Sequence, residues 1–245
     1  MNRKQLTAVL TLVFVSFVMA QDSPIVNSGS YSKVYRGKEA SFEKAVTAHV
    51  SKWHGEGQWN QFGSRVISGP MTGQYFIGTT GHYWKDYDER KNDESHDKDW
   101  ERIVNTYVEE SSGQRYYIRV PEASYKDRRS PMFSITYFNS SPAAVAKKLE
   151  LIKKIKEAAE NTNYERAWGV FLVQGLPGGN YTAVVNRLNG MADMGPSKMS
   201  WFEMWVKTFG EETANEMRDN WYNTHWNSYS EIHQLVEAMT TPPSN

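Results

Sequence analysis

Two histidines in this chain have the side-chain chemistry and the sequence setting that catalysis requires. His49 falls at helical spacing with Val46 and Val50, so a helix would place its imidazole on an apolar face. An imidazole in that place can act as a base or ligate haem iron, or it can be a core residue bonded to a backbone carbonyl. His82 ends a strand-like segment, where it would line a pocket mouth or lie on the surface. We therefore take His49 and His82 as the candidate catalytic residues.

The histidine spacing does not predict a metal site. The sequence contains no H-E-x-x-H and no H-x-H or H-x-x-x-H pair, and a spacing of five residues does not put His49 and His54 on one helix face. The acidic run at residues 85–94 lacks the central glycine of a calcium loop and is interrupted by cations. The sequence thus predicts no metal and no cofactor, with haem at His49 as the alternative.

Aromatic and cationic side chains are the candidates for ligand contact. An arginine on the inward face of a strand needs a partner, which a bound carboxylate could supply, whereas an outward arginine at a sheet edge needs none. Tryptophans can stack on a flat ligand or on a glycan, or they can fill the core. The predicted ligand-binding residues are Tyr75, Tyr181, Arg187, Trp53 and Trp84.

An internal repeat indicates the scaffold that would hold these side chains. Residues 62–75, FGSRVISGPMTGQY, and residues 168–181, WGVFLVQGLPGGNY, match at a constant offset of 106 positions. The match pairs Tyr75 with Tyr181 and keeps three glycines, which allow the positive φ angles of a hairpin loop. The chain is therefore predicted to contain one strand-turn-strand unit twice.

Apolar periodicity predicts further elements around each hairpin. The first half is expected to contain strand 30–36, helix 39–53, hairpin 62–83, a helix over 100–108 and strand 115–120. The second half is expected to contain strand 132–138, a helix after Ser141, hairpin 168–188, helices after Ser200 and Gly210, and strand 230–239. The order strand, helix, strand, strand, helix, strand predicts an α+β fold with tandem ferredoxin-like (βαββαβ) units at 28–121 and 132–240. A polar linker, 122–131, would join them.

Two such units, each with the hairpin pattern F/W-G-x-x-apolar-apolar-x-G-x-x-x-G-x-Y, resemble the dimeric α/β-barrel superfamily. The resemblance covers about residues 28–240. It implies an intrachain pseudo-dimer in which the two sheets face each other and enclose a pocket. Members of that superfamily include cofactor-independent monooxygenases, haem-handling enzymes and proteins with no known activity. The resemblance therefore implies a cavity but not a reaction.

The termini and the composition indicate where such a protein would work. Residues 1–20 have the basic start, apolar run and small-residue end of a cleavable signal peptide, so we expect export to the periplasm or the medium. Residues 21–27 are expected to be a disordered leader, and 241–245 a tail. The chain has no cysteine, which excludes thiol chemistry. Its balanced charge gives no basis for nucleic-acid binding, and no second apolar run reaches membrane length.

The predicted function is binding of a small organic molecule between the two sheets, with catalysis left open. One alternative is a cofactor-independent or haem-dependent monooxygenase, because an oxygenase without a cofactor needs only a dry pocket, a base and an electron-rich substrate. A second is a glycan-binding or envelope interaction module that uses tryptophans in loops, Trp59 and Trp84. The pseudo-dimer could also pair again as a homo-oligomer.

Overall fold

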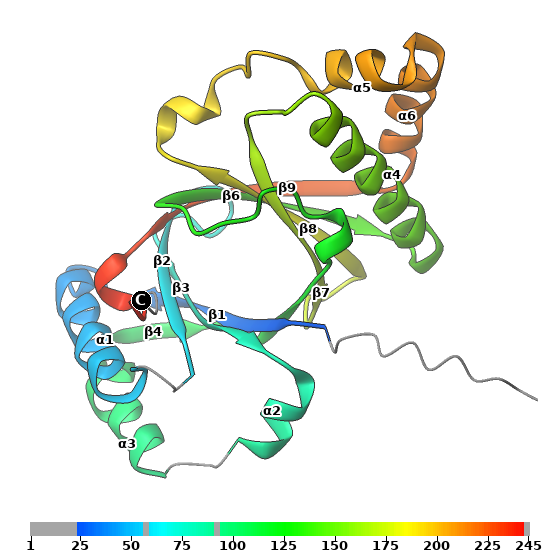
Figure 1. Cartoon of the computed structure of the whole chain (residues 1–245). Coiled ribbons are helices and arrows are strands. Elements are labelled where there is room, and N and C mark those ends of the chain that lie inside the picture. Colours follow the sequence, from blue (N-terminus) through cyan, green and yellow to red (C-terminus); the bar gives the residue numbers. More distant parts are fainter. Residues whose placement is uncertain (1–23, 56–58, 91–93, 243–245) are drawn as a thin grey trace, which may run out of the picture.

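The structure, a computed structural model, describes residues 24–55, 59–90 and 94–242. In this part of the chain, eight antiparallel strands close into a barrel, and six α-helices lie outside it in two groups (Figure 1). The expected signal peptide, residues 1–20, lies outside the described residues. No described helix is both long enough and apolar enough to cross a membrane.

The first half begins with a strand and an amphipathic helix. Phe42, Val46 and Val50 recur every four residues on α1 and are buried, which explains why this segment packs as a helix. The elements are β1 (Val26–Val34), α1 (Glu39–Trp53), β2 (Gln61–Ser68), β3 (Tyr75–His82), α2 (Trp84–Glu89), α3 (Glu94–Ile103), β4 (Val108–Ser111) and β5 (Arg115–Arg119). The helix expected over 100–108 instead gives way to a 3₁₀ turn after Ile103, and α2 occupies part of the charged run at 85–94.

The second half has helix starts that the sequence predicts. The Ser141 hydroxyl accepts from Ala144 N at 3.3 Å ahead of Pro142, and Ser200 forms a capping box with Glu203. Gly210 has a φ of 82° and separates two helices. The elements are β6 (Met132–Ser140), α4 (Pro142–Asn161), β7 (Ala167–Gln174), β8 (Asn180–Leu188), α5 (Trp201–Phe209), α6 (Glu211–Asn223) and β9 (Asn227–Leu235).

The barrel closes because each half pairs with the other at both edges. The strand order is β2–β3–β1–β5 in the first half and β7–β8–β6–β9 in the second, and the junctions are β2 with β9 and β5 with β7. Strands β4 and β5 pair with the same edge of β1: β5 with residues 26–29, and β4 with residues 32–34. Closure leaves no free edge among these eight strands and gives the barrel an inside, where side chains from both halves meet.

The repeat at offset 106 does not superpose the two hairpins. Gly63 pairs with Ile77, which centres the first hairpin on residue 70, whereas Gly169 pairs with Val185, which centres the second on residue 177. The two hairpins therefore correspond at an offset of 107, one residue more than the sequence match. A slip of one residue turns a strand side chain to the opposite face. Phe62 accordingly packs inside the barrel, while Trp168, its match at offset 106, packs in the core outside it. The repeat thus predicted both hairpins correctly, but it paired residues of the first hairpin with residues that point to the opposite face of the barrel wall in the second.

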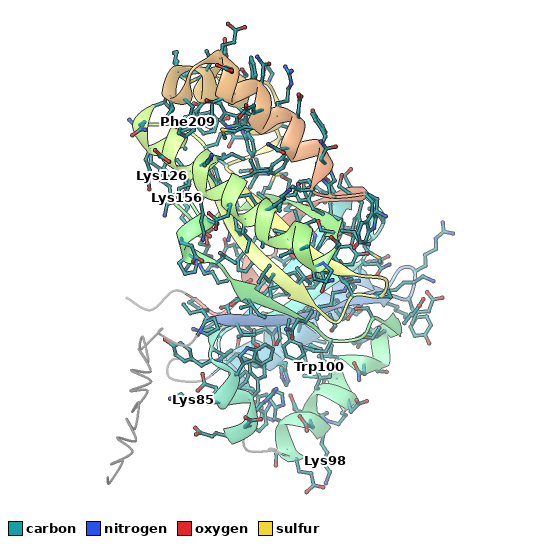
Figure 2. All side chains as sticks on the ribbon, turned by 90° about the vertical axis from the view of Figure 1, so that its right-hand side faces the viewer. Lys85, Lys98, Trp100, Lys126, Lys156 and Phe209 are labelled. Atoms are coloured by element: carbon teal, nitrogen blue, oxygen red, sulfur yellow. The ribbon has the colours of Figure 1, made fainter. Side chains whose placement is uncertain are left out.

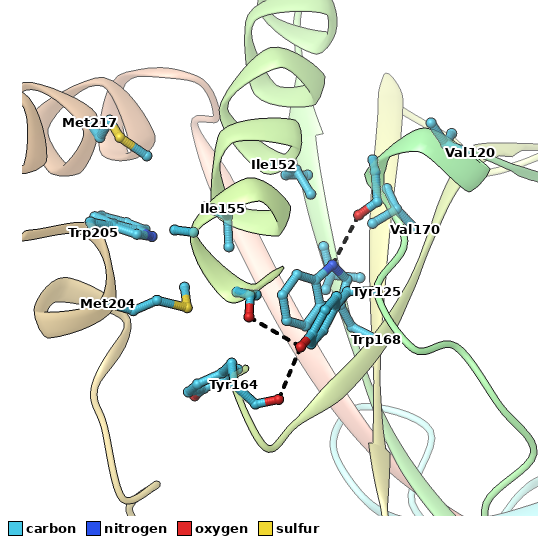
Figure 3. Packing of buried hydrophobic residues seen from close by; sticks show 14 of the residues in the cluster. Val120, Tyr125, Ile152, Ile155, Tyr164, Trp168, Val170, Met204, Trp205 and Met217 are labelled. Atoms are coloured by element: carbon cyan, nitrogen blue, oxygen red, sulfur yellow. Dashed lines mark hydrogen bonds between the residues drawn. The ribbon is translucent and has the colours of Figure 1, made fainter. Parts of the chain in front are cut away.

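Two outer cores fasten the helices to the barrel (Figure 2). In the second half, Trp168 donates from Nε1 to Ala123 O at 3.0 Å, and Tyr125 donates to Ala159 O and Tyr164 O (Figure 3). In the first half, α1 covers the outer face of β3. These cores attach the helices of each half to the outer face of the barrel.

Several boundary expectations need correction. Strand β1 begins at Val26, so the expected leader 21–27 is ordered at its end. The expected polar linker 122–131 includes Tyr125, which is buried in the outer core. The expected tail begins with Thr241, whose hydroxyl donates to His54 O at 2.9 Å. On α4, Lys148 is fully buried although its side chain ends in an ammonium group.

Candidate functional site

A cavity of about 460 Å³ opens at one end of the barrel. Its apolar wall comes from strands of both halves: Phe62, Phe76, Phe133, Ile135, Phe171 and Val185. The cavity reaches the surface at Asn60, Arg128 and Arg129, which are exposed. A concave, mainly aromatic space with a few polar groups is the usual form of a small-molecule site.

Four arginines lie around the mouth of this cavity, and acidic residues only partly neutralise them. Asp127 receives Arg187 Nε at 2.7 Å and Arg119 Nη2 at 3.1 Å. Arg129 pairs with Glu237, while Arg128 makes no ion pair with any described residue. The mouth thus carries an excess of positive charge, which favours an anionic group on a ligand.

A buried hydrogen-bonded network lies beneath the cavity. Tyr117, which lines the cavity, bonds to Tyr137 at 3.0 Å between hydroxyls, and Tyr137 bonds to Tyr31 at 3.3 Å. Tyr31 donates to Glu231 Oε2 at 2.5 Å, and Glu231 Oε2 lies 3.2 Å from His233 Nε2. This chain of polar groups connects the cavity to a carboxylate that is 1% exposed. We call these five residues the inner network.

The burial of the inner network governs its protonation. Burial raises the pKa values of Tyr31 and Tyr137 well above the ordinary value, so both hydroxyls keep their protons. Glu231 Oε1 and Arg115 Nη1 are buried and have no hydrogen-bond partner among the described residues. Unsatisfied buried polar atoms are rare in proteins and often mark functional sites. The network can therefore pass a proton from the cavity toward Glu231.

Of the predicted ligand-binding residues, Arg187 lines the cavity and the two tyrosines do not. Tyr75 points outward to α1, where its hydroxyl donates to Glu43 Oε1 at 2.6 Å. Tyr181 packs inside the barrel, near its other end, and its hydroxyl accepts from Asn139 Nδ2 at 3.2 Å. Neither tyrosine is among the residues that line the cavity, and the two face opposite sides of the barrel wall because the hairpins correspond at an offset of 107 rather than 106.

Trp53, Trp84 and His82 also lie away from the cavity wall. Trp53 donates from Nε1 to Asp99 Oδ2 at 3.1 Å outside the barrel. Trp84 is 37% exposed and contacts Tyr116. His82 stacks on Trp59 with ring centroids 3.7 Å apart, two residues beyond Thr80, which lines the cavity. Its Nε2 has no partner among the described residues, and burial lowers its pKa.

His49 is buried on α1 as predicted, but its neighbours are polar. Its Nδ1 lies 3.1 Å from Asp99 Oδ2, and its Nε2 lies 3.1 Å from His96 Nε2. His54 completes a cluster of three histidines outside the barrel. His49 and His54 do not share a helix face, as expected from their spacing; they meet because the helix ends at Trp53 and His54 leaves it with φ −127° and ψ 40°. Burial lowers the pKa of both, that of His54 to about 4.

The sequence reading missed the inner network. Its members do carry a signal, since polar side chains recur at every second position of strand-forming segments: Tyr229, Glu231 and His233 in β9, and Arg115, Tyr117 and Arg119 in β5. Period-two polarity in a barrel strand indicates an inward polar face. Nothing local to these strands shows that the faces meet.

The cavity does not offer a haem an axial ligand. None of the six histidines, all within the described residues, lines it. His233, beneath it, has Nδ1 bonded to Ser64 Oγ at 3.0 Å and Nε2 bonded to Glu231. The hydroxyl of Tyr117 is bonded to Tyr137. The haem alternative therefore does not fit the residues around this cavity.

Comparisons with known proteins identify the fold. No family model matches the chain, and no curated protein matches it by sequence. Similar solved structures include a proposed monooxygenase of Lactobacillus acidophilus, with TM-score 0.56 and 11% identity over 90% of this chain and 96% of that one. An anthrone oxidase-like protein gives 0.53 and 12%, over 89% and 93%. Chlorite dismutase of Candidatus Nitrospira defluvii, in complex with imidazole, gives 0.53 and 9%, over 90% and 95%.

These identities are low, so the likeness shows the fold alone. The chain is an α+β protein with an eight-stranded antiparallel barrel and six described helices, and it has the fold of the dimeric α/β-barrel proteins. The cavity and the inner network are properties of its own residues.

Proposed function

We propose that the barrel cavity binds a small organic anion with a flat apolar body. The observation that carries this proposal is the combination of a phenylalanine-lined cavity with an arginine-rich mouth. The body would pack among Phe76, Phe133 and Phe171, and its carboxylate or phenolate would meet Arg187 and Arg128. Burial of an aromatic ring supplies affinity, and a guanidinium pair orients the anionic group.

Calorimetric titration with aromatic carboxylates and their uncharged amides tests this proposal. The carboxylates should bind more tightly, and Arg187→Met should remove about tenfold to a hundredfold of their affinity while leaving the amides unchanged. Arg218→Met, on α6 and remote from the cavity, is the matched control. Equal binding of acids and amides, or no binding of either, would contradict the proposal.

A second candidate, a cofactor-independent monooxygenase, is favoured by the inner network. A substrate proton would pass to the Tyr117 oxygen, and each hydroxyl would hand its proton on until Glu231 is protonated through Tyr31. The substrate anion left in the cavity would be the electron-rich species that reacts with oxygen. General-base catalysis of this kind contributes about 10² to 10⁴ in rate.

The oxygenase candidate is tested by oxygen uptake in the absence of any added cofactor. Anthrone, named in one structural neighbour, and electron-rich phenols are suitable probes. Glu231→Gln keeps the size of the side chain and should abolish uptake, while Glu216→Gln on the exposed face of α6 should not. Uptake that survives Glu231→Gln would reject the network as the base.

The remaining proposals concern the chain as a whole. We infer that its two halves are tandem ferredoxin-like units, supported by their matching strand orders.

Export through cleavage after Ala20 predicts a mature chain that begins at Gln21, which N-terminal mass spectrometry of the exported protein tests. A further homodimer of the pseudo-dimer is tested by light scattering. Loss of oligosaccharide-induced fluorescence quenching in Trp59→Ala and Trp84→Ala would favour the glycan-binding alternative.

A further inference from the structure

We propose that His49, His54 and His96 form a binding site for a divalent transition-metal ion of the zinc class. The three residues come from α1, the turn that follows it and α3, on the outside of the first half. The site is separate from the barrel cavity, so it does not depend on the proposed function.

The spacing of the three imidazoles fits one ion. His96 Nε2 lies 3.1 Å from His49 Nε2 and 3.4 Å from His54 Nε2, and all three ligand atoms lie within 4.8 Å of one another. Zinc binds histidine nitrogen at about 2.0–2.1 Å in tetrahedral geometry, which puts two ligand nitrogens about 3.3 Å apart. Two of the three pairs already have that separation, so a small closing movement would complete the set.

The other ring nitrogens determine where the lone pairs point. His54 Nδ1 lies 2.6 Å from Trp59 O, and a carbonyl can only accept, so this nitrogen carries the hydrogen. His49 Nδ1 faces Asp99 Oδ2 at 3.1 Å, and His96 Nδ1 faces Asp97 Oδ1 at 3.0 Å. With the hydrogen on Nδ1 of each ring, the three Nε2 lone pairs point at one place. A metal ion, or a proton shared between two of the rings, can hold them together there.

The partners of the Nδ1 atoms are those of a metal centre. A ligating histidine commonly donates its second nitrogen to a carboxylate or a backbone carbonyl, which orients the ring and makes it a stronger ligand. Asp99 is 6% exposed, and Lys52 Nζ, Trp53 Nε1 and Arg102 Nη2 also bond to it. This buried, fully bonded carboxylate holds the His49 ring in place.

The donor set indicates the class of ion. Three imidazoles suit zinc, copper, nickel and cobalt, whereas magnesium and calcium prefer oxygen ligands. Three protein ligands also leave one coordination position for water or another small donor. His49 and His54 are buried and the His96 side chain is 18% exposed, so the ion can enter beside His96.

The test uses the untagged full chain after removal of metals with a chelator. Calorimetry should show one zinc ion per chain, and cobalt should give the visible absorption bands of a tetrahedral site, while magnesium and calcium should not bind. His96→Gln, at the most exposed ligand, should lower zinc affinity by about 100-fold and abolish the cobalt bands. His225→Gln, in the second half, is the matched control and should bind zinc as the parent does.

Two further measurements make the outcome decisive. Asp97→Asn lies on the surface and should weaken zinc binding by about tenfold without loss of the fold, since it touches only the outer nitrogen of His96. Histidine ring NMR of the zinc-loaded chain should show hydrogen on Nδ1 and metal on Nε2. Stoichiometric zinc uptake that persists in both His96→Gln and His49→Gln, or no uptake by the folded parent, would overturn the proposal; a shared proton would then hold the cluster together.

Discussion

The hydroxyl of Tyr31 lies 3.3 Å from the hydroxyl of Tyr137 inside the barrel, and the two residues are 106 positions apart in the chain. They occupy corresponding places in β1 and β6, the first strands of the two halves. The repeat offset that fails for the hairpins therefore holds for the first strands. The two equivalent tyrosines meet inside the barrel and connect the cavity to Glu231.

Tyr137→Phe tests the cost of interrupting this contact. The substitution removes one buried hydroxyl that bonds to both Tyr31 and Tyr117, so we expect the free energy of unfolding to fall by about 1.5 kcal/mol. Urea denaturation of the variant measures it. Tyr229→Phe is the control, because Tyr229 stacks on Tyr137 and its hydroxyl forms no hydrogen bond with any described residue, so this variant should change stability by less than about 0.5 kcal/mol.

Because Lys148 is buried, we expect the free energy of unfolding to rise with pH. Burial against Phe138 and Trp221, with no carboxylate partner in the part of the chain that the structure describes, lowers its pKa to about 7. The unfolded chain, with a lysine pKa of about 10.4, binds more protons than the folded chain between these values. Stability should therefore increase from pH 7 to pH 10 and be flat below pH 7 as far as this group is concerned.

Lys148→Met should remove that slope. At pH 6 the variant should be more stable than the parent by on the order of 3 kcal/mol. The parent must either keep the charged ammonium group of Lys148 buried or move this side chain out to solvent, and both lower its stability. Denaturation at pH 6 and pH 9 measures the difference. Lys147→Met, at the exposed neighbouring position, should leave the pH dependence unchanged, and an equal slope in the parent and Lys148→Met would contradict the assignment.

Gly78 is required where β1 and β3 approach each other. A Cβ at this position would lie 2.0 Å from Ser28 O, a backbone atom that cannot move away. Gly78→Ala should therefore lower the free energy of unfolding by about 3 kcal/mol. Gly113→Ala is the matched control, since nothing lies within 4 Å of its Cβ. Thermal melts of both variants should show a loss at Gly78 alone.

Asp127→Asn should have opposite effects on stability and binding. The carboxylate holds Arg119 and Arg187, and the variant should lose about 1–3 kcal/mol of stability when that charge is removed. The freed arginines should then bind an aromatic carboxylate about tenfold more tightly. Asp219→Asn, at an exposed ion pair with Arg218, should change neither quantity. Weaker anion binding in Asp127→Asn would show that Asp127 orients the arginines.

Local chemistry explains the part of the fold that could be predicted. Helix 39–53, the caps at Ser141 and Ser200 and the break at Gly210 depend on residues within a few positions of one another. Hairpin positions follow from glycine and strand alternation in the same way. Which face of a strand points inward is harder to predict, because a slip of one residue reverses it, as the places of Tyr75 and Tyr181 show.

The sites themselves depend on contacts between distant segments. Tyr117, Tyr137 and Glu231 meet because β5 pairs with β7 and β9 pairs with β2, which closes the barrel. His96 reaches His49 because α3 packs against α1, although no spacing rule relates the two positions. A pattern in the chain reports neighbours along a strand or helix, whereas a cavity or a ligand cluster exists only after the elements have packed.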